Sequence, residues 1–226
     1  MSVLIVAAHP DDEVLGCGGT IARLGEEGQD VYIAILGEGV TSRFNHQKDA
    51  PPDLIKTLQR TAHQASKILK AKDIFIYNMP DNRFDTVPLL EIIKTIEGLI
   101  SRLSPKIIYT HHGFDLNIDH QLVHRAVLTA TRPMNYASVK EVFAFEVPSS
   151  TEWAFQRLGQ PFRPNVFVDI SKTLETKLHA LSLYETEVKY FPHPRSPEAI
   201  QATAHRWGSV IGCKAAEAYE LIRSIK

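Results

Sequence analysis

The chain has 226 residues, of which 44% are hydrophobic and 23% are charged, and its formal net charge is −1. This near-neutral balance argues against a nucleic-acid-binding protein, which normally has a basic face. The first apolar run, "VLIVAA", is too short for the core of a signal peptide or for a membrane span. We therefore expect one folded domain over residues 1–226, located in the cytoplasm, with both cysteines reduced.

Strand and helix patterns alternate at the start of the chain. The apolar runs at 3–8 and 31–36 are typical of buried strands, and "GCGGTIARLGEEG" between them has the pattern of a short helix that ends near Gly28. A strand, helix and strand of this length form a βαβ unit with parallel strands. The segment 37–52 has no periodicity, and a loop of this length in a compact domain is usually functional.

The same alternation continues to the end of the chain. It predicts an α/β protein with a Rossmann-like, mostly parallel twisted sheet flanked by helices. The further predicted strands are 74–79, 106–112, 142–147 and 165–170, and the further helices are about 53–71, 88–103, one from near His120, 172–189, and a final one marked by apolar residues from Ile200 to Ile222.

Polar residues are concentrated where the predicted strands end. The residues that follow parallel strands gather along one edge of the sheet, where ligands bind in this class of fold. Four such segments supply histidine, aspartate, asparagine and arginine side chains to this edge. They are "HPDDE" (9–13), "GEGVTSR" (37–43), "PDNRFD" (80–85) and "HHGFDLNIDH" (111–120).

The segment "HPDDE" places three carboxylates side by side, where they repel one another. One interpretation is a helix start, with Pro10 in the first turn and the acidic residues near the positive end of the helix dipole. Each such contact contributes only about 0.3–1 kcal/mol, which is too little to offset the repulsion, and it does not explain His9. A divalent cation bound by His9 and Asp12 explains both features.

A catalytic zinc site usually has three protein ligands and one open position. The segment "NIDH" offers His120 as the third ligand after His9 and Asp12. His124 is an alternative, because residues four apart share one face of a helix. Two weaker alternatives are His111 and His112.

Asp11 remains free beside this ligand set, in the position that a general base needs. A metal lowers the pKa of a bound water from about 15.7 to roughly 7 and polarises a carbonyl under attack. Asp119 could orient the neighbouring imidazoles. The residues therefore predict metal-assisted hydrolysis.

Three segments carry a family resemblance. The sequences "AHPDDEVLGCGGTIARL", "HHGFDLNIDHQLVHRAV" and "PHPRSPEAI … CKAAEAYELIR" resemble the LmbE-like, or PIG-L, family of zinc-dependent N-deacetylases. The resemblance covers nearly the whole chain. It implies a Rossmann-like α/β fold, a single zinc (or Fe²⁺ in the cell), and a homo-oligomer. It also implies that a water activated by an aspartate at the metal attacks the acetamide of an N-acetylglucosamine-type sugar.

Carried over by position, the resemblance makes His9, Asp12 and His120 the zinc ligands and Asp11 the general base. Glu13 then has a supporting structural role. Many family members have a histidine three residues before the last ligand, where this chain has Asn117. An amide can donate a hydrogen bond to an oxyanion but cannot deliver a proton at neutral pH.

The proton for the leaving amine must therefore come from another group. Asp11 could switch from base to acid after the attack, or His193 of "PHPRS" could supply the proton. The resemblance makes His193 and Arg195 of this segment site candidates.

The remaining polar residues at this edge are suited to a sugar, since they offer donors and acceptors for hydroxyl groups. Asp81 and Asn82 could equally form an Asx-type turn. Arg43 or Arg195 could meet a phosphate if the sugar is attached to a nucleotide, a lipid or another metabolite, or could be a surface arginine. The substrate-binding candidates are Arg43, Asp81, Asn82, Arg83, Asp115 and Arg195.

Three other functions are compatible with parts of this pattern. One is a metal-dependent hydrolase of another amide or ester, with loops 37–52 and 149–165 setting the substrate. Another is a metal-binding protein without turnover, although a structural site would not need the spare Asp11. The third is a nucleotide-binding Rossmann domain, but "GCGGTI" has Ile21 where a third fingerprint glycine belongs.

Overall fold

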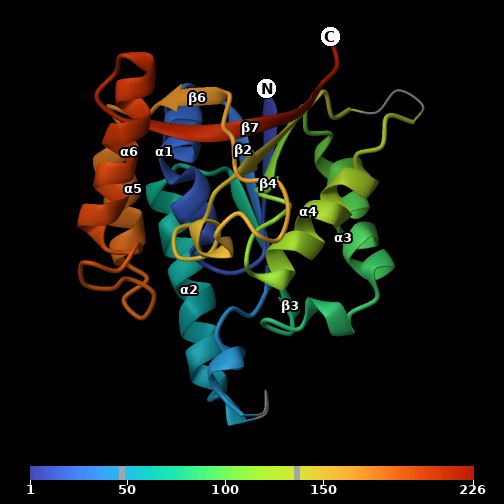
Figure 1. Ribbon diagram of the computed structural model, residues 1–226. Helices are drawn as coiled ribbons and strands as arrows, with labels where there is room; N and C mark the ends of the chain where they lie inside the picture. Colours follow the sequence, from blue (N-terminus) through green and yellow to red (C-terminus); the bar gives the residue numbers. More distant parts are fainter. Residues whose placement is uncertain (46–48, 135–137) are drawn as a thin grey trace.

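A central sheet lies between two layers of helices (Figure 1). The structure, a computed structural model, describes residues 1–45, 49–134 and 138–226. These residues form a seven-stranded sheet in the order β3-β2-β1-β4-β5-β7-β6. The strands are β1 (Ser2–Ala7), β2 (Asp30–Gly37), β3 (Asp73–Met79), β4 (Ile107–His111), β5 (Glu141–Phe145), β6 (Val166–Asp169) and β7 (Ala216–Ser224).

Helices and short 3-10 turns connect the strands. The long helices begin and end close to the predicted positions in the first half of the chain and depart from them in the second half. The α-helices are α1 (Asp12–Glu26), α2 (Pro52–Ile68), α3 (Leu89–Leu103), α4 (Ile118–Ala130), α5 (Leu174–Ser182) and α6 (Pro197–Ile211), and the 3-10 helices are η1 (Thr41–Arg43), η3 (Phe84–Thr86) and η4 (Glu152–Ala154).

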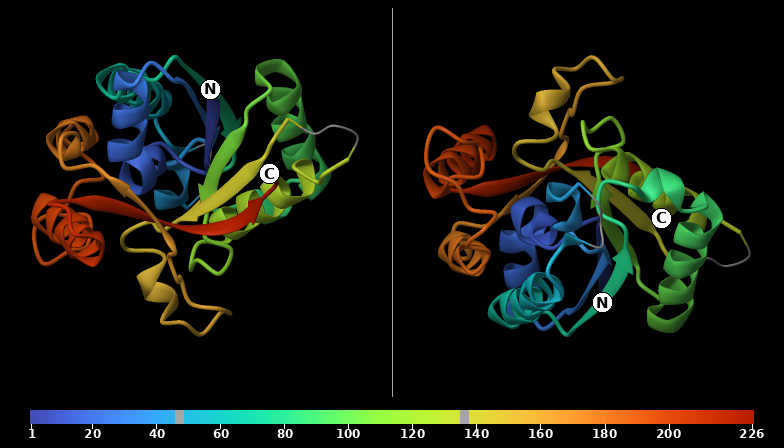
Figure 2. Two further views of the ribbon diagram at one scale, coloured as in Figure 1. Left: turned by 90° about the horizontal axis from the view of Figure 1, so that it is seen from above. Right: turned by 90° about the horizontal axis from the view of Figure 1, so that it is seen from below.

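The alternation of side chains along β1 explains the two layers. Val3, Ile5 and Ala7 pack into a core with residues of α1, α2 and α5, whereas Leu4 and Val6 pack into a second core with residues of α3 and α4. All five side chains are completely buried, because a central strand has one face toward each core. The two views in Figure 2 show α3 and α4 on one face of the sheet and the other helices on the opposite face.

The predicted fold class is confirmed, with one antiparallel strand. β1 pairs in parallel with β2 and β4, and β2–β3 and β4–β5 are also parallel. β7 is antiparallel to both of its neighbours, β5 and β6. Because the chain moves from β1 to one side through β2 and later to the other side through β4, the end of β1 is the switch point where ligands bind in such sheets.

The prediction of a final helix reaching Ile222 was wrong beyond Ile211. Gly212 has a φ of 76°, a left-handed conformation that ends α6 and that glycine adopts without a steric penalty. After this turn, residues 216–224 continue as β7 and fill the position between β5 and β6. Tertiary pairing therefore overrode a helical spacing of apolar residues.

The helix predicted over 172–189 ends seven residues early, at Ser182. The chain turns there because Tyr184 is only 1% exposed and its hydroxyl donates to the buried carboxylate of Glu13. The segment from 183 to 195 is thereby brought to the edge of the sheet where β1 ends. In the described parts of the chain, no helix has an apolar stretch long enough to cross a membrane.

Candidate metal and catalytic site

A tight turn joins β1 to α1 at the switch point. Its last residue, Asp11, has a φ of 107°, which L-residues rarely adopt and which costs on the order of 1–3 kcal/mol. Local hydrogen bonds compensate this strain. The N–H of Asp11 donates to the Glu13 carboxylate (3.0 Å), and the carbonyl of Asp11 accepts the N–H groups of Val14 and Leu15. The turn therefore holds Asp11 in one orientation.

The buried side chain of Glu13 stabilises this turn. It is completely buried, and its second oxygen accepts the hydroxyl of Tyr184 at 2.5 Å. Burial raises the pKa of Glu13 to about 7, although the hydrogen bonds from Tyr184 and from the backbone act in the opposite direction. The structure thus places Glu13 as a support of the turn and away from the cavity.

Three buried residues converge beside Asp11. The donor atoms of His9, Asp12 and His120 lie within 4.8 Å of one another. Asp12 Oδ2 is 3.4 Å from Nδ1 of His9 and 3.3 Å from Nε2 of His120. The other oxygen, Asp12 Oδ1, is buried and has no hydrogen-bond partner among the described residues. A cation bound by this carboxylate would satisfy that oxygen.

The chemistry of this donor set also fits a metal. Two imidazole nitrogens and one carboxylate oxygen form the kind of three-ligand set that leaves a position open on zinc, and ferrous iron accepts the same donors. Burial alone would lower the pKa of His120, but the charge of Asp12 and the nearby Asp115 raise it to about 9. The cluster therefore favours positive charge at this point.

A second set of carboxylates faces the imidazole nitrogens that point away from Asp12. His9 Nε2 is 2.9 Å from Asp119 Oδ2 and 3.3 Å from Asp81 Oδ1. His120 Nδ1 is 3.2 Å from Asp115 Oδ1, close but without the alignment of a hydrogen bond. Each ring thus directs one nitrogen toward Asp12 and the other toward a carboxylate, as metal-binding histidines do.

Asp115 is fixed in place from the other side. It is completely buried and accepts the hydroxyls of Ser150 and Thr151. Burial alone would raise the pKa of this carboxyl group, but His120 and the two hydroxyls lower it to about 2. Sequence reasoning assigned Asp115 to substrate binding, and the structure places it against His120 and outside the cavity described below.

The other candidate histidines lie outside the three-residue cluster. The ring of His111 stacks on His120 at 3.9 Å between centroids, and its Nε2 accepts the N–H of Ala8. His124 donates from Nδ1 to the carbonyl of His111. His112 contacts Glu220 of β7. The structure therefore brings His120 to Asp12, and it engages His124 and His112 elsewhere.

A cavity of about 160 Å³ opens beside this cluster. Its walls come from the ends of β1, β2, β3 and β4 and from the segment after α5. The sequence-predicted site residues that line it are His9, Asp11, Arg43, Asp81, Asn82, Asn117, His120 and Arg195, and Glu187 lines it as well. Asp12 lies beneath it, next to His9 and His120.

Two further candidates lie outside the cavity wall. Arg83 is exposed at the start of η3. His193 packs edge-on against Trp153, and its Nδ1 accepts the N–H of Arg195. In this arrangement His193 has its Nδ1 occupied and does not line the cavity.

Asn117 has a fixed amide orientation. Its Oδ1 accepts the N–H of Asp119 at 2.8 Å and so caps α4, while its Nδ2 donates to Oδ1 of Asn82 at 2.9 Å. Since the oxygen is used by the helix, the N–H₂ group is the part presented to the cavity. Asn82 is held in turn, because its own Nδ2 donates to Asp81 and Ser42.

Glu187 is the residue that sequence reasoning missed. Its two carboxylate oxygens lie 2.5 and 2.6 Å from Nη2 of Arg43, and Nη1 of Arg195 is 3.5 Å away. The same Nη1 donates to Asp11 Oδ2 at 2.8 Å. Glu187 stood inside a segment predicted to be helical, and the only signal that could have marked it was its place just before "PHPRS".

Fold and site together define an α/β protein with a buried His–Asp–His cluster and a second aspartate, Asp11, beside it at the switch point of the sheet. Residues 4–131, more than half of the chain, match the PIG-L family, described as GlcNAc-PI de-N-acetylase. The chain belongs to this family of deacetylases.

Individual relatives agree with this assignment. The chain is 30% identical over 190 residues to the uncharacterized deacetylase YaiS of Escherichia coli, covering 81% of this chain and 90% of YaiS. It is 24% identical over 226 residues to the diacetylchitobiose deacetylase of Thermococcus kodakarensis, covering 99% and 84%. Both alignments include most of each relative.

Solved structures share the fold. N,N′-diacetylchitobiose deacetylase from Pyrococcus horikoshii matches with a TM-score of 0.77 at 18% identity, over 98% of this chain and 84% of that chain. GalB, the 4-carboxy-2-hydroxymuconate hydratase of Pseudomonas putida, matches with a TM-score of 0.75 at 20% identity, over 100% and 97%. Since this fold occurs in enzymes of different reaction classes, the reaction has to be inferred from the site.

Proposed function

We propose that this protein is a zinc-dependent N-deacetylase that hydrolyses the acetamide of an N-acetylglucosamine-type sugar, releasing acetate and a free amine. The observation that carries the proposal is the buried cluster of His9, Asp12 and His120, in which Asp12 Oδ1 has no hydrogen-bond partner among the described residues, with the carboxylate of Asp11 in the adjoining cavity. The family match and the diacetylchitobiose deacetylase of Thermococcus kodakarensis support the sugar substrate.

In this proposal His9, Asp12 and His120 hold the metal, with ferrous iron as the alternative to zinc. When bound there, the metal supplies a Lewis acid that polarises the acetamide carbonyl and makes water more acidic. Asp119 and Asp115 hold the two imidazoles in their ligating orientation.

Asp11 acts as the general base. Its carboxylate lines the cavity next to the cluster, and Arg195 holds one of its oxygens at 2.8 Å. Burial raises the pKa of Asp11 well above its ordinary value, although the charge of Arg195 acts in the opposite direction. A carboxylate with a raised pKa is a stronger base, which suits proton removal from water.

Asn117 donates to the oxyanion that develops on the acetamide oxygen. Its Oδ1 is occupied by the cap of α4 and one hydrogen of its N–H₂ group is donated to Asn82, so the second hydrogen is available on the cavity side. The proton for the leaving amine comes from Asp11, which holds the proton taken from water. His193 is the less favoured donor, because it does not line the cavity.

The first experiment combines metal analysis with an activity assay on the same purified protein. We expect about one zinc or iron ion per chain. Amine release from N-acetylglucosamine and N,N′-diacetylchitobiose should stop with a chelator and return when metal is restored. Amine release that is unaffected by metal removal would overturn the proposal.

Asp11→Asn separates an enzyme from a metal-binding protein without turnover. The variant should retain metal and lose hydrolysis, since Asn cannot accept a proton from water. Loss of metal together with activity would make Asp11 a ligand and contradict its assignment as the general base. Activity on other amides or esters, with none on acetamido sugars, would favour the broader hydrolase alternative.

A further inference from the structure

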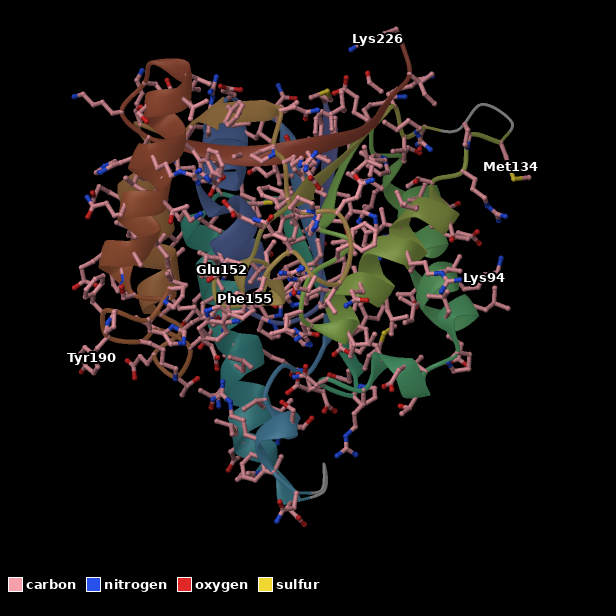
Figure 3. All side chains as sticks on the ribbon, viewed as in Figure 1. Lys94, Met134, Glu152, Phe155, Tyr190 and Lys226 are labelled. Atoms are coloured by element: carbon pink, nitrogen blue, oxygen red, sulfur yellow. The ribbon has the colours of Figure 1, made fainter. Side chains whose placement is uncertain are left out.

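The cavity wall contains a carboxylate to which the proposed mechanism gives no role. Glu187 lies in the loop between α5 and α6, and its side chain is only 6% exposed. Tyr190, labelled in Figure 3, lies farther along the same loop and is 96% exposed. The loop therefore combines exposed residues, such as Tyr190, with the buried Glu187, which lines the cavity.

Glu187 neutralises the arginines of the cavity. It binds Arg43 through both carboxylate oxygens and lies 3.5 Å from Arg195, which also donates to Asp11. Within the part of the chain that the structure describes, both guanidinium groups lining the cavity are thus paired with carboxylates. Among the described residues, neither guanidinium group is therefore an unpaired cation that could bind an anionic ligand.

The charges that line the cavity also argue against an anionic substrate. The cavity is lined by the carboxylates of Asp11, Asp81 and Glu187, by the guanidinium groups of Arg43 and Arg195, and at the metal cluster by the imidazoles of His9 and His120. A phosphate or carboxylate on the substrate would meet like charge or would have to displace Glu187 from Arg43. A sugar hydroxyl can donate to a carboxylate and accept from a guanidinium, so it fits these pairs without breaking them.

We propose that Glu187 determines the substrate class of this enzyme by neutralising Arg43 and Arg195, so that the cavity accepts uncharged acetamido sugars and disfavours those with an adjoining phosphate or carboxylate. The inference rests on the proposed deacetylase function. It replaces the expectation that Arg43 or Arg195 binds a phosphate of the substrate.

Two ligands that differ only in one phosphate test this proposal, namely N-acetylglucosamine and N-acetylglucosamine 1-phosphate. Their dissociation constants are measured by calorimetry on metal-free protein, where no hydrolysis occurs, and kcat/KM is measured on metal-loaded protein. The wild type should prefer the neutral sugar at least tenfold. In Glu187→Gln the preference should move toward the phosphate sugar by at least tenfold. The reason is that Arg43 and Arg195 then lose the carboxylate that neutralises them in the wild type.

Two variants serve as controls. Glu27→Gln removes the carboxylate of another Glu–Arg pair, formed with Arg23 at 2.8 Å on the exposed side of α1, and should leave the preference unchanged. Glu187→Asp keeps the charge and should keep most of the preference for the neutral sugar. Melting temperatures of all variants identify any that fail to fold.

The possible outcomes are distinct. A wild type that prefers the phosphate sugar, or a Glu187→Gln variant that changes both ligands equally, would overturn the inference. Equal loss in Glu187→Asp and Glu187→Gln would do the same, since charge would then not be the cause. A protein that binds the neutral sugar selectively but never hydrolyses it would contradict the proposed function while supporting the role of Glu187.

Discussion

Nε2 of His9 lies 2.9 Å from Oδ2 of Asp119, while Nδ1 of the same ring faces Asp12 at 3.4 Å. The opposite oxygen of Asp119 accepts the N–H of Phe84, so the carboxylate is itself fixed. Asp119 thus holds the His9 imidazole on the side away from Asp12, and Asp119 is itself hydrogen-bonded to the backbone of η3. This arrangement sets the direction in which Nδ1 points.

Asp119→Asn should weaken metal binding about 10- to 100-fold, as loss of a carboxylate behind a ligating histidine usually does. Competition with a chromophoric chelator measures this affinity. Asp85→Asn is the matched control, since Asp85 is an exposed aspartate of η3, next to the Phe84 whose N–H binds Asp119. Equal affinity in both variants would show that Asp119 does not orient His9.

The two functions of Asn117 can be separated by one substitution. Asp caps a helix as well as Asn does but cannot donate a hydrogen bond when ionised. Asn117→Asp should therefore keep the cap of α4, lose the hydrogen bond to Asn82 and lower kcat by about 10²–10³. Asn117→Ala should lower kcat similarly and also destabilise the protein by about 1 kcal/mol. Normal turnover by the Asp variant would exclude the oxyanion role.

Gly39 and Gly28 form a matched pair for testing the support of His9. Both have left-handed backbones, with φ of 76° and 74°, but a Cβ at Gly39 would lie 2.5 Å from Cδ of Pro10, whereas one at Gly28 would meet nothing within 4 Å. Alanine at either position should cost about 1–2 kcal/mol of unfolding free energy. Only Gly39→Ala should also weaken metal binding, by about tenfold or more, because Pro10 and His9 must move. Similar affinities in both variants would contradict this.

Glu13 should make stability depend on pH in a characteristic direction. Its pKa is raised by burial from 4.5 to about 7, so between these values the folded state binds a proton that the unfolded state has lost. The stabilisation is complete below pH 4.5 and is lost as pH rises through 7. In metal-free protein, wild type should lose up to about 3 kcal/mol relative to Glu13→Gln over this range. Denaturant unfolding at several pH values measures the difference, and parallel curves would contradict the prediction.

The residues of the cluster were predictable because strand ends of a parallel sheet share an edge. His9 follows β1 and His120 follows β4, and these two strands are hydrogen-bonded neighbours. The spacing of residues within "HPDDE" then supplied Asp12 and Asp11. Local sequence was sufficient for His9, Asp11 and Asp12, which directly follow β1, whereas His120 lies further from its strand, in the first turn of α4.

Other parts of the site depend on contacts that no local pattern encodes. Asp115 is placed behind His120 by Ser150 and Thr151, more than thirty residues away. Glu187 lies in a stretch whose apolar spacing predicted a helix to residue 189. The helix in fact ends at Ser182, because Tyr184 is buried. Gly212 was the one available signal that the last helix stops before β7.

The segment matched by the family, residues 4–131, contains the three candidate metal ligands, Asp11, Asn117 and the carboxylates behind the imidazoles. Glu187 and Arg195 come from the later loop between α5 and α6. Under the proposed function, the metal ligands and the general base thus lie in the matched segment, whereas Glu187, the proposed determinant of the substrate class, lies in the later loop and pairs with Arg43 of the matched segment. Because Arg195 of the same loop donates to Asp11, we expect an exchange of residues 183–195 between relatives to change the substrate preference and keep turnover only where Arg195 is retained.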